Sequence, residues 1–218
     1  MSLSIETFPV GAFQCNCSIL ACEETKEAVV IDPGDELAKI LARLDKRGLK
    51  VVQIIHTHAH LDHIGATGSL KHARGGSILL HKDDMYLYDA QAMQAQMLGL
   101  AEPEHPTQPD DYLEHDDPVR WGRGGLLTTL HTPGHTPGSL CFHLDGGDRQ
   151  LVFTGDTLFL GSIGRTDLPG GDYGQIMASI RDRLLDLGDE TMVIPGHGPG
   201  STIGKEKGWN PFVQELMA

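Results

Sequence analysis

Residues 51–65 read VVQIIHTHAHLDHIG, and the two halves of this stretch differ in composition. The first five residues are largely apolar, which is typical of a strand buried on both faces. The second half places four metal-binding side chains within six residues, at His58, His60, Asp62 and His63. Side chains two positions apart on an extended chain point the same way, so His58 and His60 can bind one ion together. Four such side chains are more ligands than one metal ion with an open coordination position binds, so the spacing predicts two metal ions.

Three later segments share one local pattern, in which an apolar strand leads to a potential ligand next to a glycine. They read LHTPGH, LVFTGD and MVIPGH, and they end at His135, Asp156 and His197. Glycine lets the chain turn sharply at the end of a strand. Because functional groups are often carried on loops at the edge of a rigid sheet, we expect these three residues to join the first four.

The seven residues can be divided between two ions. The expected sets are His58, His60 and His135 for one ion and Asp62, His63 and His197 for the other, with Asp156 bridging both. Two divalent ions with two ligand carboxylates and a bridging hydroxide would keep a small net positive charge, which attracts an oxyanion. The alternative interpretation is a loop that is merely rich in histidine. His56 and His131 are expected to support the ligands or to pack in the core, and Asp32 either bonds the metal loop or forms a simple Asp-Pro turn.

Length and composition restrict the class of protein. The chain has 218 residues without a Ser/Gly/Pro linker, which predicts one domain over residues 1–218. The net charge of −13 argues against nucleic acid or an anionic membrane as a partner. The start, MSLSIETFPVG, lacks the features of a signal peptide, no apolar run is long enough to span a membrane, and the four cysteines show no zinc-finger spacing. These features predict a cytoplasmic protein with reduced thiols.

Apolar patterns predict a similar alternation of strands and helix in each half of the chain. Expected strands cover residues 3–10, 15–22, 26–31, 51–55, 77–80, 125–131, 139–144, 150–154 and 191–194. Expected helices cover residues 36–47 (with Asp35 as N-cap), 64–73 and 173–187, and residues 82–118 are expected to form one or two short helices and a proline-rich loop. This alternation suits two stacked sheets flanked by helices.

The motif His58-x-His60-x-Asp62-His63, followed by His135, Asp156 and His197, resembles that of the metallo-β-lactamase superfamily, and the match covers nearly the whole chain. The resemblance implies an α/β fold, the αββα four-layer sandwich, with a dinuclear site among the loops at one edge of the two sheets. The segments THAHLDH, TPGHTPG and GRTD resemble the glyoxalase II (hydroxyacylglutathione hydrolase) group. The stretch GSIGRTDLPGGD is most similar to the short, single-domain bacterial members of that group.

This resemblance implies a metal-dependent hydrolase, a thioesterase that cleaves S-lactoylglutathione or a related acyl thioester with a metal-bound hydroxide. Asp62 and Asp156 would be catalytic residues in addition to metal ligands. The cofactors would be two divalent ions, with zinc as the first choice and iron or manganese as alternatives. The partner would be a small molecule, a glutathione thioester, rather than nucleic acid or a membrane. A thiolate, with a pKa of about 8.5, can leave without a general acid.

The sequence departs from full-length glyoxalase II after His197. Those proteins carry a further helical domain whose basic residues bind glutathione, whereas only residues 199–218 follow Gly198 here. Lys205 and Lys207 are the cations of this tail and are candidate glutathione contacts, with a solvated surface pair as the alternative. Arg165 is a further candidate for substrate binding, with a loop-fixing ion pair to Asp167 as the alternative.

Several other functions are compatible with the same residues. A persulfide dioxygenase shares the fold and the GRTD segment, and its single iron would lie on His58, His135 and Asp156. A lactonase-type hydrolase is a further alternative, while a true β-lactamase would be exported. A non-catalytic, metal-stabilised binding module would have closed coordination, whereas seven ligands for two ions leave open positions.

Overall fold

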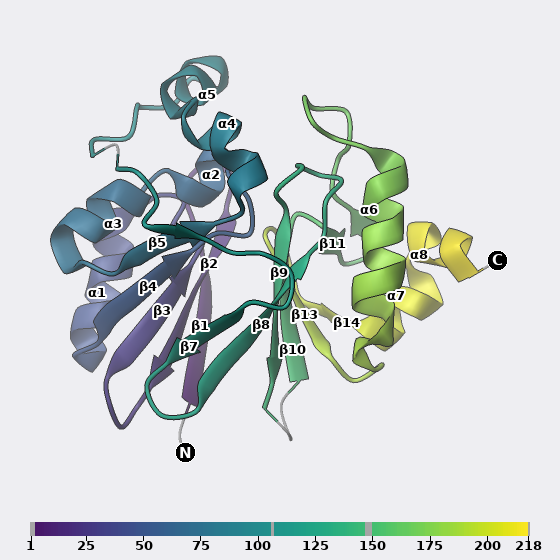
Figure 1. The fold of residues 1–218 in the computed structure, drawn as a ribbon, viewed down its shortest axis with the longest axis horizontal. Helices are drawn as coiled ribbons and strands as arrows, with labels where there is room; N and C mark the ends of the chain where they lie inside the picture. The colour runs from purple at the N-terminus through teal and green to yellow at the C-terminus, as the bar shows by residue number, and fades with distance from the viewer. Residues whose placement is uncertain (1–2, 106, 147–149, 218) are drawn as a thin grey trace.

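The computed structural model describes residues 3–105, 107–146 and 150–217, and within them two six-stranded sheets pack face to face (Figure 1). The first sheet contains, in spatial order, β1 (Leu3–Val10), β2 (Cys15–Cys22), β3 (Glu27–Ile31), β4 (Lys50–Ile55), β5 (Ser77–Leu80) and β6 (Asp111–Tyr112). The second contains β14 (Ser201–Thr202), β13 (Met192–Pro195), β10 (Gln150–Gly155), β9 (Leu140–Asp145), β8 (Gly125–His131) and β7 (Pro118–Trp121). A small ribbon joins β11 (Leu158–Phe159) to β12 (Ser162–Ile163).

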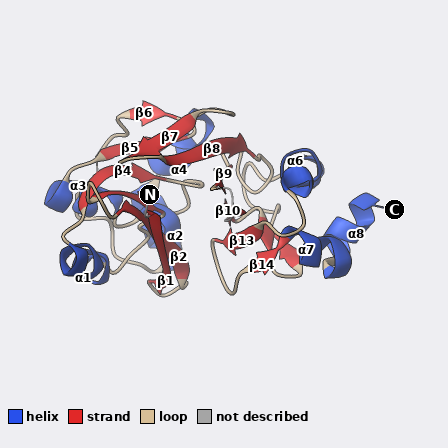
Figure 2. Cartoon of the chain, turned by 90° about the horizontal axis from the view of Figure 1, so that it is seen from below, coloured by secondary structure: helices blue, strands red, loops and turns tan. Residues whose placement is uncertain are grey.

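Helices cover the outer face of each sheet (Figures 1 and 2). The helices of the first half are α1 (Leu37–Arg47), α2 (Leu61–Ile64), α3 (Thr67–Arg74), η1 (Lys82–Asp84), α4 (Met85–Tyr88) and α5 (Gln91–Leu98). Of these, α1 and α3 cover the sheet, whereas α2, α4 and α5 lie toward the strand ends at one edge (Figure 1). The helices of the second half are α6 (Tyr173–Ser179), the π-helical η2 (Ile180–Leu184), η3 (Leu185–Leu187), α7 (Ile203–Trp209) and α8 (Pro211–Met217). The αββα sandwich is therefore confirmed. No helix in the described part of the chain is both long and apolar enough to cross a membrane.

Strand β4 contributes to a core on each face of the first sheet, through Ile54 and Ile55, as its apolar run predicted, and β2 does the same. Ile19 of β2 packs in the core that includes Ile40 of α1, whereas its neighbour Leu20 packs in the core between the sheets with Phe142 of β9. Successive side chains of a strand point to opposite faces, so one strand contributes to both cores. Fully burying a side chain of this size contributes about 1.5–3 kcal/mol.

The direction of the strands brings their ligand-bearing ends to one edge. Strands β3, β4 and β5 run parallel in the first sheet, and β10 and β13 run parallel in the second. Strand β8 has the same direction as β10, because both are antiparallel to β9. The loops that follow β3, β4 and β5 therefore start at one edge of the first sheet, and those that follow β8, β10 and β13 start at one edge of the second.

The expected helix over residues 64–73 is interrupted, so this prediction was partly wrong. Helix α2 ends at Ile64 and α3 starts at Thr67. The Ala66 N–H donates to the Pro33 carbonyl (3.0 Å) rather than to its own helix. The chain passes so close there that a Cβ on Gly65 would lie 2.5 Å from the Gly34 oxygen. Contact with the 32–34 turn therefore breaks the helix.

Other differences lie at element ends and in short elements. The expected helix over residues 173–187 continues beyond α6 only as η2 and η3. The N-cap of α1 is Glu36, at a left-handed φ of 50°, rather than Asp35. The patterns missed the short or peripheral elements β6, β7, β11, β12, β14, α7 and α8.

Candidate metal centre

The loop after β4 and the loop after β8 bring three histidines together. His58 and His60 lie on either side of Ala59, and their ring centroids are 4.8 Å apart. The ring of His135 lies 4.8 Å from that of His58 and 4.7 Å from that of His60. His135 Nε2 is 3.0 Å from His60 Nδ1. One nitrogen of each ring therefore faces a common point.

A second group forms beside the first, from the first turn of α2 and the loop after β13. His197 Nε2 lies 3.1 Å from Asp62 Oδ2 and 3.2 Å from His63 Nε2. His63 Nε2 is 3.7 Å from Asp62 Oδ2. The three donor atoms can again surround one ion.

Asp156 lies between the two groups. Its Oδ2 is 3.6 Å from His135 Nε2, and its Oδ1 is 3.5 Å from His63 Nε2. Asp156 Oδ1 and His58 Nε2 are buried without a hydrogen-bond partner. Burying an unpaired polar atom is costly, so such atoms call for a ligand. The seven predicted residues come together as two nitrogen- and oxygen-rich groups joined by a carboxylate, a donor set that fits two divalent metal ions.

The protonation tendencies of the two groups differ. Burial, reinforced by neighbouring histidines, lowers the pKa of His58 well below its usual value and that of His60 to about 3. Burial also favours a low pKa at His63. The pKa of His63 is nevertheless raised well above the usual value, by Cys15, Asp62 and Asp156 and by the hydrogen bond to Asp32. His58 and His60 therefore keep free lone pairs, whereas protons bind more readily in the second group.

His197 and Asp62 form a charge-assisted pair within this second group. Burial favours a low pKa at His197, but its hydrogen bond to Asp62 and the charge of Asp156 raise that pKa. Burial also opposes ionisation of Asp62, yet His63 and His197 lower the pKa of its carboxyl. Asp62 is therefore held as a carboxylate, the form that binds a metal.

Asp32 supports the metal loop from the end of β3. Its buried carboxylate accepts hydrogen bonds from the Thr57 N–H (2.8 Å) and the Thr57 hydroxyl (2.6 Å). Its Oδ2 also lies 3.0 Å from His63 Nδ1, which orients Nε2 of that ring toward the centre. Of the two interpretations of Asp32, bonding to the metal loop is the correct one.

Main-chain carbonyls orient two further histidines. His135 Nδ1 lies 2.8 Å from the Arg165 carbonyl, and His197 Nδ1 lies 3.0 Å from the Phe13 carbonyl. A carbonyl accepts the proton of Nδ1 and leaves the Nε2 lone pair facing the centre. His56 is buried, with Nε2 3.2 Å from the Thr67 hydroxyl, and His131 stacks on His81.

Asp84 supports the centre and was missed in the sequence. Its buried carboxylate accepts hydrogen bonds from the Ala59 N–H (2.9 Å), the Thr136 hydroxyl (2.8 Å) and the Gly138 N–H (2.7 Å). It therefore ties the His58–His60 loop to the His135 loop. The available signal was its position just after a buried strand at the same edge of the sheet.

Gln94 of α5 was also missed. Its Oε1 accepts from the Leu61 N–H (2.9 Å), and its Nε2 donates to the Ala59 carbonyl (3.0 Å). The amide thus holds the metal loop from the side of α5, and nothing in a short exposed helix indicates such a contact.

A cavity of about 660 Å³ opens beside the two groups. It is lined by Phe13, His60, Asp62, Tyr86, Leu87, Ala90, Met93, Gln94, Met97, Leu98, His135, Asp156, Arg165, Leu168, Pro169 and His197. Arg165 forms a bidentate ion pair with Asp167, with both N–O distances 2.7 Å, so the loop-fixing pair exists, and Arg165 is also among the residues that line the cavity.

Lys205 and Lys207 lie elsewhere, on α7. Neither lines the cavity, and Lys207 Nζ lies 2.6 Å from Asp189. Contact of these lysines with a substrate stays a prediction.

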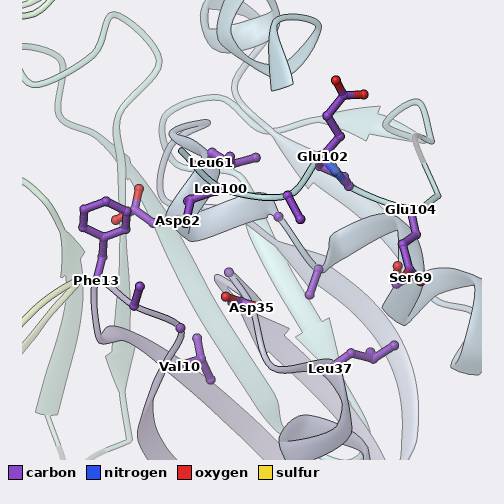
Figure 3. Close-up of a pocket in the computed structure, with 17 residues that line it drawn as sticks. Val10, Phe13, Asp35, Leu37, Leu61, Asp62, Ser69, Leu100, Glu102 and Glu104 are labelled. Atoms are coloured by element: carbon purple, nitrogen blue, oxygen red, sulfur yellow. The ribbon is translucent and has the colours of Figure 1, made fainter. Parts of the chain in front are cut away.

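A smaller groove of about 290 Å³ adjoins the cavity on the side of Asp62 (Figure 3). It shares Phe13 and Asp62 with the cavity and is bordered by the acidic residues Asp35, Glu102 and Glu104. The centre thus faces an apolar cavity on one side and an acidic groove on the other.

Two curated proteins cover most of the chain. A hydroxyacylglutathione hydrolase GloC from Haemophilus influenzae is 41% identical over 212 residues, which cover 97% of this chain and 98% of that protein. The mitochondrial persulfide dioxygenase ETHE1 from Homo sapiens is 32% identical over 198 residues, covering 88% of this chain and 69% of that protein.

Solved structures have the same fold. The BLEG-1 B3 metallo-beta-lactamase has a TM-score of 0.87 at 35% identity, covering 96% of this chain and 99% of that one. TTHA1623, solved in a di-iron-bound form, has a TM-score of 0.84 at 42% identity, covering 95% and 99%. The model of the Metallo-beta-lactamase superfamily matches residues 10–197. The chain therefore belongs to the Metallo-beta-lactamase superfamily.

Proposed function

We propose that the protein is a metal-dependent thioesterase of the hydroxyacylglutathione hydrolase type. The observation that carries the proposal is the paired donor set joined by Asp156, which opens directly onto a cavity large enough for a small-molecule substrate. The full-length similarity to a hydroxyacylglutathione hydrolase supports the same activity.

The residues would hold two ions as the motif predicts. His58, His60 and His135 would bind one and Asp62, His63 and His197 the other, with Asp156 shared. When bound, such ions lower the pKa of a water ligand to about 7 and polarise a carbonyl group. Zinc suits these donors, and iron and manganese accept them too.

The chain's own groups favour a substrate with a good leaving group. Tyr86 is the phenol at the cavity wall, and its hydroxyl donates to the Pro169 carbonyl (3.0 Å). Arg165 is tied to Asp167, so neither side chain is poised to protonate a leaving amine. A thiolate, with a pKa of about 8.5, leaves without that proton. This arrangement therefore favours thioesters over amides.

A second candidate is a persulfide dioxygenase with one iron on His58, His135 and Asp156. The similarity to a persulfide dioxygenase over 88% of the chain favours it. The two activities differ in metal count and in oxygen consumption.

The test is a parallel assay of purified, metal-analysed protein. S-lactoylglutathione is supplied and thioester loss followed, while oxygen uptake is followed with glutathione persulfide. We expect thioester hydrolysis with about two metals per chain. Oxygen uptake with one iron and no thioester loss would contradict the proposal and favour the dioxygenase.

A further inference from the structure

Large apolar side chains are exposed around the cavity. Met93 is 61% exposed, Met97 80% and Phe13 46%, and Tyr86 and Leu98 are similarly open. They come from the β1–β2 turn, α4 and α5 and face the same cavity. A cluster of exposed apolar side chains on a soluble protein marks a binding surface.

The charge of the cavity wall complements an apolar group rather than a peptide with two carboxylates. Arg165 is the one lysine or arginine among the described residues that line it, and its guanidinium is already paired with Asp167. Lys205 and Lys207 do not reach the cavity. Glutathione carboxylates would therefore find little to pair with on this wall.

The cavity is continuous with the metal centre. Its lining includes His60, His135 and Asp156 of the centre together with Met93 and Met97 of α5. A carbonyl carbon placed at the centre would thus direct one arm of the substrate along the methionines. Methionine side chains are flexible and adapt to ligands of different shape.

We propose that this cavity binds the acyl arm of the thioester, and that preferred substrates carry an aliphatic or aromatic acyl group larger than lactoyl. This inference rests on the proposed thioesterase function. The volume of about 660 Å³ lies within the range of small-molecule sites, about 300–1,000 Å³, and exceeds what a three-carbon acyl group needs.

The first test measures kcat/KM of the metal-loaded protein for S-acetyl-, S-butyryl-, S-hexanoyl- and S-benzoylglutathione. We expect kcat/KM to rise along the aliphatic series, by at most about fourfold per buried methylene. The Met93→Gln/Met97→Gln variant should flatten the series, because kcat/KM should fall more for the hexanoyl than for the acetyl substrate. Met192→Gln, which changes another exposed methionine, on β13 outside the cavity, should keep the slope. A flat series in the unmodified protein, or the same slope in the double variant, would overturn the inference.

The second test uses binding and needs no turnover. S-hexylglutathione should bind the metal-loaded protein more tightly than S-methylglutathione in calorimetry, and the double methionine variant should lose this difference. If no acylglutathione is hydrolysed but the binding difference is found and is lost in the variant, the thioesterase proposal fails and the apolar site stands. Hydrolysis with equal binding of the two ligands would leave the thioesterase and reject the site.

Discussion

Asp84 shows how much of the centre depends on residues that are not ligands. It accepts hydrogen bonds from two loops, 25 residues earlier and 52 to 54 residues later in the chain. The ionised carboxylate can accept all three hydrogen bonds, because both of its oxygens are acceptors and neither carries a proton.

Replacing Asp84 by Asn should therefore weaken both the fold and the metal centre. The amide NH₂ would face a backbone N–H, leaving at least one buried donor unpaired at a cost of about 1–3 kcal/mol. Urea unfolding and metal analysis check this. Asp83→Asn, which changes a neighbouring half-exposed carboxylate, is the matched control. Equal stability and metal content in the two variants would reject this role.

The prediction of two metal ions that share a ligand depends on Asp156. Asp156→Ala should remove the carboxylate that lies between the two groups, so metal content and thioesterase activity should fall together. His72→Ala changes a histidine away from the cavity and should preserve both. Full activity in Asp156→Ala would exclude a bridging role.

Sequence spacing located the seven donor residues but not the groups that orient them. These candidate ligands were recognisable because four fall in one short motif and three repeat one pattern beside glycine. The Gln94 amide and the Phe13 and Arg165 carbonyls act through tertiary contacts. Such contacts leave no local pattern.

At the level of elements, the turn after β3 is fitted closely to the metal loop. A Cβ on Gly34 would lie 1.6 Å from the Asp62 carbonyl oxygen. The same turn also contacts Gly65 and Ala66 and interrupts the helix there, which explains why an apolar pattern over residues 64–73 predicted one helix where two form.

Gly34→Ala should displace this loop. We expect it to destabilise the protein by about 1–3 kcal/mol, a typical cost of overpacking, and to lower metal content. Gly208→Ala in α7, where a Cβ meets no neighbour, should instead raise the free energy of unfolding by about 0.5–1 kcal/mol. Thermal unfolding and metal analysis compare the two. An unchanged metal content in Gly34→Ala would contradict the close fit.

Long elements were predictable where a pattern is sustained, and their ends or irregular continuations were not. Apolar residues at Ile176, Ile180 and Leu184 do face the core, as the helical spacing predicted. The backbone nevertheless changes from α-helix to η2 and η3, since burial of a face does not dictate the hydrogen-bond pattern. Two-residue strands such as β6 and β14 are defined by pairing with neighbours rather than by composition.

On the scale of the whole molecule, loops that follow strands of both sheets bring the seven candidate ligands together. The alternation of strands and helix in the two halves predicted the stacked sheets, and the family motif gave the four layers. The pattern over residues 82–118 allows a methionine-rich pocket wall but favours packing against the sheet, and it does not indicate that Met93 and Met97 are exposed beside the centre.

The two metal groups should release their ions at different pH. His63 and His197 have a raised pKa and so take up protons at higher pH than His58 and His60, whose pKa is lowered. Because protons compete with metals for histidine, acidification below neutrality should first remove the ion of the Asp62 group. Metal analysis after dialysis of zinc-loaded protein at stepwise lower pH should show a plateau near about one ion per chain. Simultaneous loss of both ions would contradict this difference.

The most direct test of a dinuclear thioesterase is stepwise metal reconstitution. The metal-free protein is titrated with zinc, and separately with ferrous iron, while bound metal, S-lactoylglutathione hydrolysis and oxygen uptake with glutathione persulfide are measured on the same samples. We predict that hydrolysis rises until about two ions are bound per chain, without oxygen uptake. Saturation at one iron with oxygen uptake and no thioester loss would contradict the account.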